Sequence, residues 1–181
     1  MNLLALDLSL TRTGWATHHS VLAGPHATGT ITPPKGMGGV ERLIWIRKSL
    51  TGLISLVELV VMEGYSYGVA RGNALTQLGE LGGVVRVLFH ELGVPWVEVP
   101  PATLKKYATG KGNAGKAEVL VAAVRRLGYE GSDDNVADAM WLRAMALDAF
   151  GAMPSPVPKA QQEALLKIEW PGSERGRRPD G

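Results

Sequence analysis

The chain contains no cysteine among its 181 residues. Disulfide frameworks and thiol catalysis are therefore excluded, and the composition is compatible with a reducing compartment. Histidine does not replace cysteine as a metal ligand, because the four histidines include no pair at ligand spacing. His18 and His19 are adjacent, so a strand would point them to opposite faces. We therefore expect no zinc site.

Long apolar runs are also missing, and no stretch reaches the length that crosses a membrane. The first ten residues lack a basic segment and are interrupted by Asp7, unlike a signal peptide. We therefore expect a soluble, cytoplasmic protein with no membrane partner. A hydrophobic content of 45% is enough for a full core, and the length suits one domain, 1–150, followed by a Pro-rich, polar and partly disordered tail, 151–181.

Net charge is small as well, at +2, but it is unevenly distributed. Residues 105–126 hold six basic side chains and one acidic side chain, Glu118. The basic residues are Lys105, Lys106, Lys111, Lys116, Arg125 and Arg126. Such a stretch on a nearly neutral protein indicates one anion-binding face, although a solvated helix face would have the same composition.

The N-terminal stretch 3–10 has the pattern of a strand, closed by turn-forming residues up to Gly14. Alternation places Asp7 on the same face as Leu3 and Ala5. A carboxylate among apolar side chains needs a metal ion, a cation or a hydrogen-bond network. The alternative is that Asp7 accepts hydrogen bonds from turn amides near Gly14.

The remaining pattern predicts an α/β protein with a mixed five-stranded sheet flanked by helices. Strands are expected at 14–21, 26–32, 59–63 and 95–99, and helices at 38–56, 73–92, 102–107, 116–127 and 135–150, with a short helix at 159–168 in the tail. The first three strands form an antiparallel meander because their links are short. The strand-helix-strand steps that follow favour parallel neighbours.

Acidic residues stand where this arrangement would bring them together. Glu63 ends the fourth strand, and ligand sites of open α/β sheets lie outside the carboxyl ends of strands, where Asp7 also lies. Asp134 and Asp138 are four residues apart and share a helix face. Capping by Asp133 or Ser132 explains the start of that helix but does not explain Asp138.

Four converging carboxylates would repel one another unless cations bind between them. Mg²⁺ prefers oxygen ligands, and a pair of such ions supports phosphodiester cleavage. The basic stretch would then hold a nucleic-acid backbone.

Four pieces of the sequence together resemble the RuvC family. They are Asp7 followed by Ser9 and Gly14, the run Val61-Met62-Glu63-Gly64, Lys105 with the run Gly110-Lys111-Gly112-Asn113-Ala114-Gly115-Lys116, and the run Asp134-Asn135-Val136-Ala137-Asp138-Ala139. The family comprises Holliday junction resolvases of the RNase H-like superfamily from bacteria and phages. The likeness covers about residues 1–150.

The resemblance implies an RNase H-like fold and a homodimer that cuts four-way DNA junctions symmetrically with two Mg²⁺ ions, or Mn²⁺ as a substitute. Asp7, Glu63 and Asp138 match the metal-binding acidic positions of the family. Asp134 is expected to be the fourth ligand, in preference to Asp133 or Asn135. The expected catalytic set is Asp7, Glu63, Asp134, Asp138 and Lys116, and Lys105 and Lys116 match basic positions that lie near the scissile phosphate in the family. The expected DNA-binding set is Lys105, Lys106, Lys111, Lys116, Tyr65, Tyr67 and Arg71. The two tyrosines follow Glu63 in a loop, where packing within the loop is the alternative to stacking on junction bases.

Parts of the sequence also match other classes of protein. Residues 110–116 fit the spacing of a phosphate-binding loop, but Ala117 replaces the required Ser or Thr. An actin-like or sugar-kinase-like phosphotransferase would need a longer chain. A nuclease for RNA–DNA hybrids or other branched DNA, and a non-catalytic junction-binding module, stay open as alternatives.

The helix predicted at 73–92 is the expected dimer contact, because glycine lets a second backbone approach closely. The glycines are Gly79, Gly82 and Gly83, and the apolar residues expected to help are Leu75, Leu78, Val85 and Leu88. Glycine in a helix costs about 1 kcal/mol relative to alanine, so a packing reason is expected. The alternative is that the glycines accommodate the chain's own sheet.

Overall fold

The protein, described by a computed structural model over residues 1–19, 27–55, 57–64 and 73–172, is built on a mixed five-stranded sheet. Strands β1 (Leu3–Asp7), β2 (Thr13–His18) and β3 (Thr28–Ile31) form an antiparallel meander. Strands β4 (Leu59–Glu63) and β5 (Trp96–Val99) continue the sheet in parallel with β1. The strand order β3-β2-β1-β4-β5 confirms the predicted topology.

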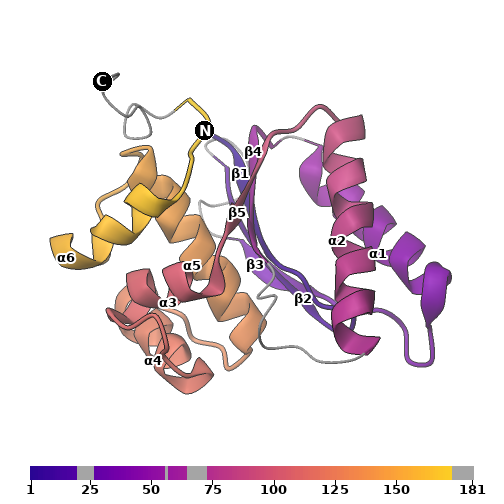
Figure 1. The fold of residues 1–181 in the computed structure, drawn as a ribbon, viewed down its shortest axis with the longest axis horizontal. Coiled ribbons are helices and arrows are strands. Elements are labelled where there is room, and N and C mark those ends of the chain that lie inside the picture. The colour runs from indigo at the N-terminus through magenta and orange to yellow at the C-terminus, as the bar shows by residue number, and fades with distance from the viewer. Residues whose placement is uncertain (20–26, 56, 65–72, 173–181) are drawn as a thin grey trace.

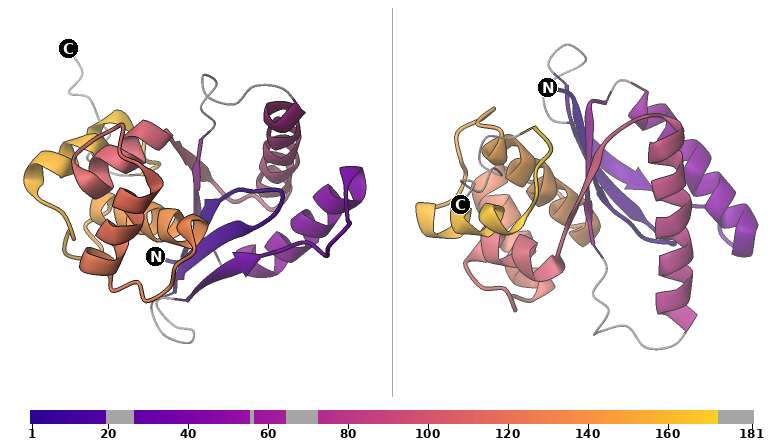
Figure 2. Two further views of the ribbon diagram at one scale, coloured as in Figure 1. Left: turned by 90° about the horizontal axis from the view of Figure 1, so that it is seen from below. Right: turned by 45° about the horizontal axis from the view of Figure 1, so that its top comes forward.

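Helices cover both faces of this sheet (Figures 1 and 2). Helices α1 (Gly39–Ile54) and α2 (Asn73–Glu91) lie on one face. Helices α3 (Pro101–Thr109), α4 (Lys116–Leu127) and α5 (Asp134–Ala149) lie on the other. Among the described residues, no helix combines the length and hydropathy needed to cross a bilayer.

Alternation along β1 divides the interior into two cores. Leu4 and Leu6 pack in the core on the α1 and α2 side. Leu3 and Ala5 pack in the core that contains α5. Because side chains alternate along a strand, Asp7 shares the α5 side with Leu3 and Ala5. The strand ends at Asp7 rather than at Leu10, which places this carboxylate at the edge of the sheet.

Helix α5 is buried along almost its whole length, from Val136 to Ala149. It packs against β1 and β2 on one side and against α3 and α4 on the others. A helix enclosed on all sides has no solvated stripe, which is why apolar side chains occur on every face of α5. Its interior includes Trp141, whose Nε1–H donates to the carbonyl of Val119 at 3.2 Å.

The segment expected as a tail packs against the domain through Trp170. It forms α6 (Lys159–Gln162) and a 3₁₀ helix, η1 (Glu163–Lys167), which contact α3. Its buried apolar side chains are Val157, Ala164, Leu165, Ile168 and Trp170. These side chains join the core that contains α5, so the packed unit extends about twenty residues beyond the expected boundary. This packing could not be predicted from hydrophobic periodicity, because prolines and charged residues interrupt the spacing of the apolar residues.

The predicted dimer contact on α2 is partly wrong, because some of its residues are buried. Val85 and Leu88 are fully buried in the chain's own core, so they cannot supply apolar surface to a partner. Gly82 is also buried. Gly79 and Gly83 instead face open space on the exposed side of the helix. The side chain of Leu75 lies outside the described residues.

Candidate metal centre

Three carboxylates from three elements meet at the carboxyl end of β1 and β4. Asp7 ends β1, Glu63 ends β4, and Asp138 lies in the second turn of α5. One oxygen of each lies within 4.8 Å of the others. The parallel pairing of β1 with β4 accounts for the first two, because parallel strands bring their carboxyl ends to one edge. The structure thus brings together three of the four carboxylates that were expected to converge.

Gly14 allows α5 to approach the sheet closely enough to complete the group. Gly14 is paired with Asp7 across the β1–β2 ladder. A Cβ atom at residue 14 would lie 2.2 Å from the backbone carbonyl of Asn135, at the start of α5. Only glycine fits there, because the clash is with backbone that no side-chain rotation can move.

We expect Gly14→Ala to displace the start of α5 and so to separate Asp138 from Asp7. Overpacking of this kind costs about 1–3 kcal/mol of stability. Thermal unfolding should show a lower Tm, and calorimetric titration with Mn²⁺ should show weaker binding. Gly52→Ala is the matched control, because residue 52 lies in α1 with open space around it. Unchanged Mn²⁺ affinity in Gly14→Ala would refute this role.

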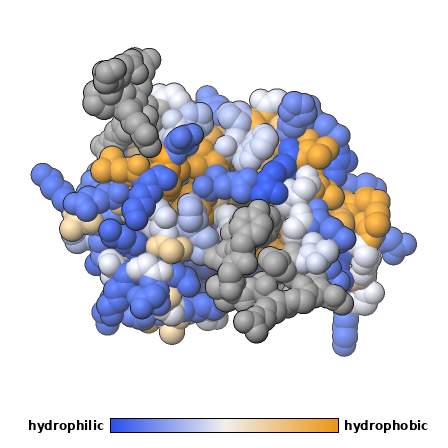
Figure 3. Space-filling view, in the orientation of Figure 1, coloured by the Kyte–Doolittle hydropathy of each residue, from blue (hydrophilic) through white to orange (hydrophobic). Residues whose placement is uncertain are grey.

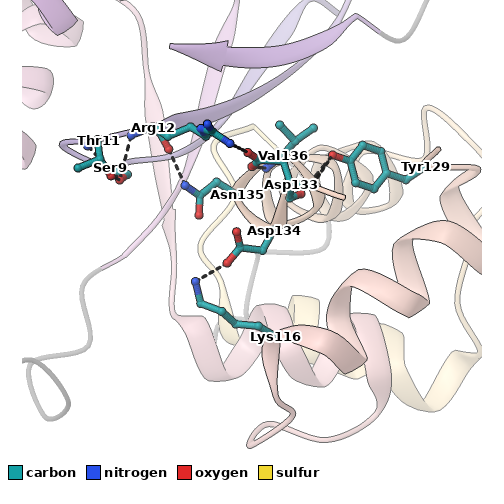
Figure 4. A network of polar contacts seen from close by, with 9 residues as sticks. All are labelled: Ser9, Thr11, Arg12, Lys116, Tyr129, Asp133, Asp134, Asn135 and Val136. Atoms are coloured by element: carbon teal, nitrogen blue, oxygen red, sulfur yellow. Dashed lines mark hydrogen bonds and ion pairs between the residues drawn. The ribbon is translucent and has the colours of Figure 1, made fainter. Parts of the chain in front are cut away.

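A polar network fastens the β1–β2 turn to the start of α5 (Figure 4). Arg12 donates to the Asp133 carboxylate at 2.9 Å, and the Asn135 side chain donates to the carbonyl of Arg12. Within the turn, the Ser9 hydroxyl accepts from the amides of Thr11 and Arg12 at 3.3 Å. These contacts hold the strand end that carries Asp7 against the helix that carries Asp138.

Asp133 is the N-cap of α5, as one of the two predicted candidates. Its Oδ1 accepts the amide of Val136 at 3.1 Å. Tyr129 braces the same residue, since its hydroxyl lies 3.1 Å from the Asp133 amide and 3.2 Å from the Asp133 carbonyl. Sequence reasoning missed Arg12 and Tyr129, whose partners are fixed only when the turn and the helix are brought together.

The electrostatics of the three carboxylates indicate a site built for cations. Burial, followed by repulsion from Glu63 and Asp138, raises the pKa of Asp7 well above its usual range. Burial raises the pKa of Glu63 as well, and it raises the pKa of Asp138 to about 7 with repulsion from Glu63 as the next cause. A cation between them would offset this cost, and three carboxylates offer the oxygen ligands that hard divalent ions prefer. The donor set therefore fits a divalent metal.

The pKa of Asp138 has a consequence for stability. The pKa of Asp138 is about 7 in the folded protein and about 4 in the unfolded chain, so the folded state holds this proton more tightly. The protonated carboxyl therefore contributes fully to stability below about pH 4, and this contribution is lost as the pH rises through about 7. Without metal, we expect the free energy of unfolding to fall by up to about 1.4 kcal/mol per pH unit over this interval. Asp138→Asn should therefore raise the Tm in EDTA much more at pH 8 than at pH 5. An equal gain at both pH values would contradict this electrostatic assignment.

Asp134 stands beside the group rather than within it. It faces Lys116 at the start of α4, and the two form an ion pair (Figure 4). The hydrogen bond from Lys116 holds the pKa of Asp134 below its usual range, and the same bond raises the pKa of Lys116. Lys116 also acts electrostatically on Asp7, Glu63 and Asp138. A cation therefore lies next to the carboxylates, at the position expected from the sequence.

The other sequence-predicted residues have different surroundings. Lys105, on α3, lowers the pKa of Glu63 electrostatically, so it lies near the centre. Lys106 is partly buried on the same helix, and Lys111 is exposed and pairs with Glu118 at 3.3 Å. Tyr65, Tyr67 and Arg71 lie outside the described residues. Helix α3, not a strand, precedes 110–116, which excludes a phosphate-binding loop of the strand-loop-helix type.

Comparison with known proteins settles the family. A crossover junction endodeoxyribonuclease RuvC from Synechococcus sp. (strain WH7803) is 32% identical over 148 residues, which are 77% of this chain and 94% of that protein. The chain belongs to the RuvC family. The RuvC of Xanthobacter autotrophicus is 34% identical over 125 residues, which are 66% of this chain and 72% of that one. No family model matches the chain.

Solved structures agree on the fold. Thermus thermophilus RuvC superposes with a TM-score of 0.62 at 21% identity, covering 78% of this chain and 90% of that one. The same RuvC in complex with a Holliday junction substrate superposes with a TM-score of 0.65 over the same share of each chain. A Fowlpox virus resolvase bound to junction DNA gives 0.51 at 11% identity, covering 78% of this chain and 93% of that one. The RuvC member described here therefore has the predicted RNase H-like fold.

Proposed function

We propose that this RuvC-family chain resolves four-way DNA junctions by metal-dependent hydrolysis of phosphodiester bonds. The observation that carries the proposal is the group of Asp7, Glu63 and Asp138 at the sheet edge, with oxygens within 4.8 Å of one another. The relatives named as crossover junction endodeoxyribonucleases support the substrate. We therefore expect the protein to act in the cytoplasm of a bacterial or phage-infected cell.

The metal is proposed to be Mg²⁺, two ions per site, with Mn²⁺ as a substitute. Asp7, Glu63 and Asp138 would hold the ions, and Asp134 would join them as a fourth ligand from the preceding turn of α5. Bound in this way, such ions lower the pKa of an attacking water and stabilise the leaving oxygen. Asp134 would then exchange its ion pair with Lys116 for metal contact.

The chain's own cations are proposed to bind and orient the DNA. Lys116 is 73% exposed beside the carboxylates, so a scissile phosphate can reach its ammonium group. Lys105 supports the same phosphate from α3. Lys106 and Lys111 continue the positive surface along the backbone. Tyr65, Tyr67 and Arg71 would contact the junction, with the two tyrosines stacking on its bases.

Synthetic substrates test the proposal directly. A labelled four-way junction, a duplex of the same sequence and an RNA–DNA hybrid should be incubated with the protein in Mg²⁺ or EDTA. We expect paired incisions on strands of like polarity, in the junction alone and only with Mg²⁺. Cleavage of the hybrid in preference to the junction would assign a different nuclease activity, and binding without any cleavage would assign a junction-binding module.

A homodimer is proposed as the active form, because a nearly two-fold junction needs two identical sites at a fixed separation. The supporting surface is the exposed side of α2, where Gly79, Gly83 and Val87 follow one another at helical spacing. Val87 is 55% exposed, and Val40 on α1 is 68% exposed. Figure 3 shows separate patches of apolar residues, among polar ones, on the right-hand side, where α1 and α2 lie in Figure 1. Exposed apolar surface is typical of a contact with another chain, which supports the proposal.

We expect Gly83→Glu to yield a folded monomer that cannot make coupled cuts. A charged side chain would block the close approach of a second helix while it meets only open space in its own chain. Sedimentation equilibrium measures the mass, and a cruciform plasmid reports whether the two cuts are coupled. Ala160→Glu, on the exposed surface of α6, is the matched control. A wild-type monomer that makes paired cuts at micromolar concentration would contradict this interface.

A further inference from the structure

A cavity of about 720 Å³ lies apart from the carboxylates, between α5, the loop that follows α4 and residues 153–156. Helix α5 lines it with five residues between Met140 and Asp148, on the C-terminal side of Asp138. The volume is in the range typical of small-molecule sites. None of the metal-centre residues lines this cavity, and none of the reactions proposed above uses it.

Arg143 is the unusual residue in the wall of the cavity. It is 5% exposed, although arginine is seldom fully buried without a partner. Its Nη1 donates to the carbonyl of Thr17 at a long 3.4 Å, and within the described ranges no carboxylate forms an ion pair with it. Burial lowers the pKa of Arg143 to about 10, which leaves it protonated at neutral pH. The cavity therefore has a desolvated positive charge on one wall.

The other charged residues around the cavity are engaged elsewhere or lie at its rim. Asp148 accepts from the Tyr107 hydroxyl at 2.9 Å and from the Ser155 hydroxyl at 2.7 Å. Arg126 is exposed and donates to Gln161 at 2.6 Å, and Glu130 is exposed. The remaining lining is mostly apolar, from Met140, Ala144, Leu147, Met153, Pro154 and Pro156.

We propose that this cavity binds a small organic anion with an apolar body, whose acidic group pairs with Arg143. A guanidinium presents a planar fork that matches a carboxylate or a similar oxyanion, and the pair is strengthened by a desolvated site. The apolar walls would cover the rest of the ligand. DNA phosphate is a poor fit, because a duplex backbone cannot reach a guanidinium buried among these side chains. The site goes beyond the proposed nuclease function and does not depend on it.

Two fluorescent probes that differ by one sulfonate group test the proposal. The first is 8-anilinonaphthalene-1-sulfonate, and the second is its neutral counterpart without the sulfonate, N-phenyl-1-naphthylamine. We expect the sulfonate to bind the full-length protein at one site with the higher affinity. Arg143→Met should weaken the sulfonate about tenfold or more, as removal of a charge-assisted hydrogen bond predicts. The affinity for the neutral probe should change by less than about twofold, since Met keeps the apolar volume.

Matched variants separate this site from other positive surfaces. Arg126→Met removes an exposed cation at the same cavity and should leave the binding of both probes unchanged. Ala144→Leu should fill part of the cavity and weaken both probes together, which keeps the proposal testable if Arg143→Met does not fold by circular dichroism. Equal affinity of wild-type protein for the two probes would overturn the proposal. Displacement of the sulfonate by excess duplex DNA would also overturn it, because the probe would then lie on the DNA-binding face.

Discussion

Asp7→Asn and Asp138→Asn should each reduce junction cleavage about 1,000-fold or more while junction binding is retained or tightened. Each change removes a proposed metal ligand, and the loss of metal stabilisation of transition-state charge is worth several kcal/mol, at about tenfold in rate per 1.4 kcal/mol. It also removes a negative charge from the position where a phosphate would lie. Single-turnover cleavage in Mg²⁺ measures the first effect, and gel mobility in EDTA measures the second.

Glu63→Gln also removes a proposed metal ligand, so it should reduce cleavage and retain junction binding in the same way. Asp133→Asn is the matched control, because Asp133 lies on the same segment but caps the helix and pairs with Arg12. Asn is also a good N-cap, so this change should cost at most about 1 kcal/mol of stability and only a small part of the rate. Strong cleavage by Asp7→Asn in Mg²⁺ would refute the metal assignment. Inactive, folded Asp133→Asn beside active Asp134→Asn would show that the fourth ligand is misassigned.

Lys116→Ala should reduce the cleavage rate about 100-fold and change junction affinity by less than about threefold. Its ammonium lies beside the carboxylates, where charge would develop on the scissile phosphate in the proposed reaction, and removal of one such stabilising group costs about 10²–10³ in rate. Rates at saturating enzyme and dissociation constants in EDTA separate the two effects. Metal affinity should be measured in parallel, because Lys116 also stabilises ionised Asp134.

Two other lysines of the basic stretch provide the comparison. Lys111→Ala removes an exposed cation that pairs with Glu118, and Lys106→Ala removes a cation on α3. Both should weaken binding mildly and uniformly, as contacts to the DNA backbone do. If Lys116→Ala had the same small effect on the rate as Lys106→Ala, the basic stretch would be a solvated helix face rather than part of the active site.

The candidate centre was predictable from the sequence because its three carboxylates follow from local patterns. The apolar runs that contain Asp7 and end at Glu63 specify strands, and parallel strands bring their carboxyl ends together. The four-residue spacing of Asp134 and Asp138 specifies one helix face. The spacing alone could not show that Asp134 pairs with Lys116 while Asp138 joins the other two carboxylates, since this depends on where α4 lies.

What the sequence by itself determined is therefore the order of the elements, the sheet topology and the position of Glu63 at the end of β4. Periodicity and turn-forming residues encode these features within short stretches. Only the tertiary structure decided which residues far apart in the chain meet. Arg12 forms an ion pair with Asp133, Gly14 lies in close contact with the backbone of Asn135, and Trp170 packs in the core that contains α5. Tertiary packing also turned Val85 inward and left Arg143 beside a cavity, because burial depends on what covers a face and not on the local sequence.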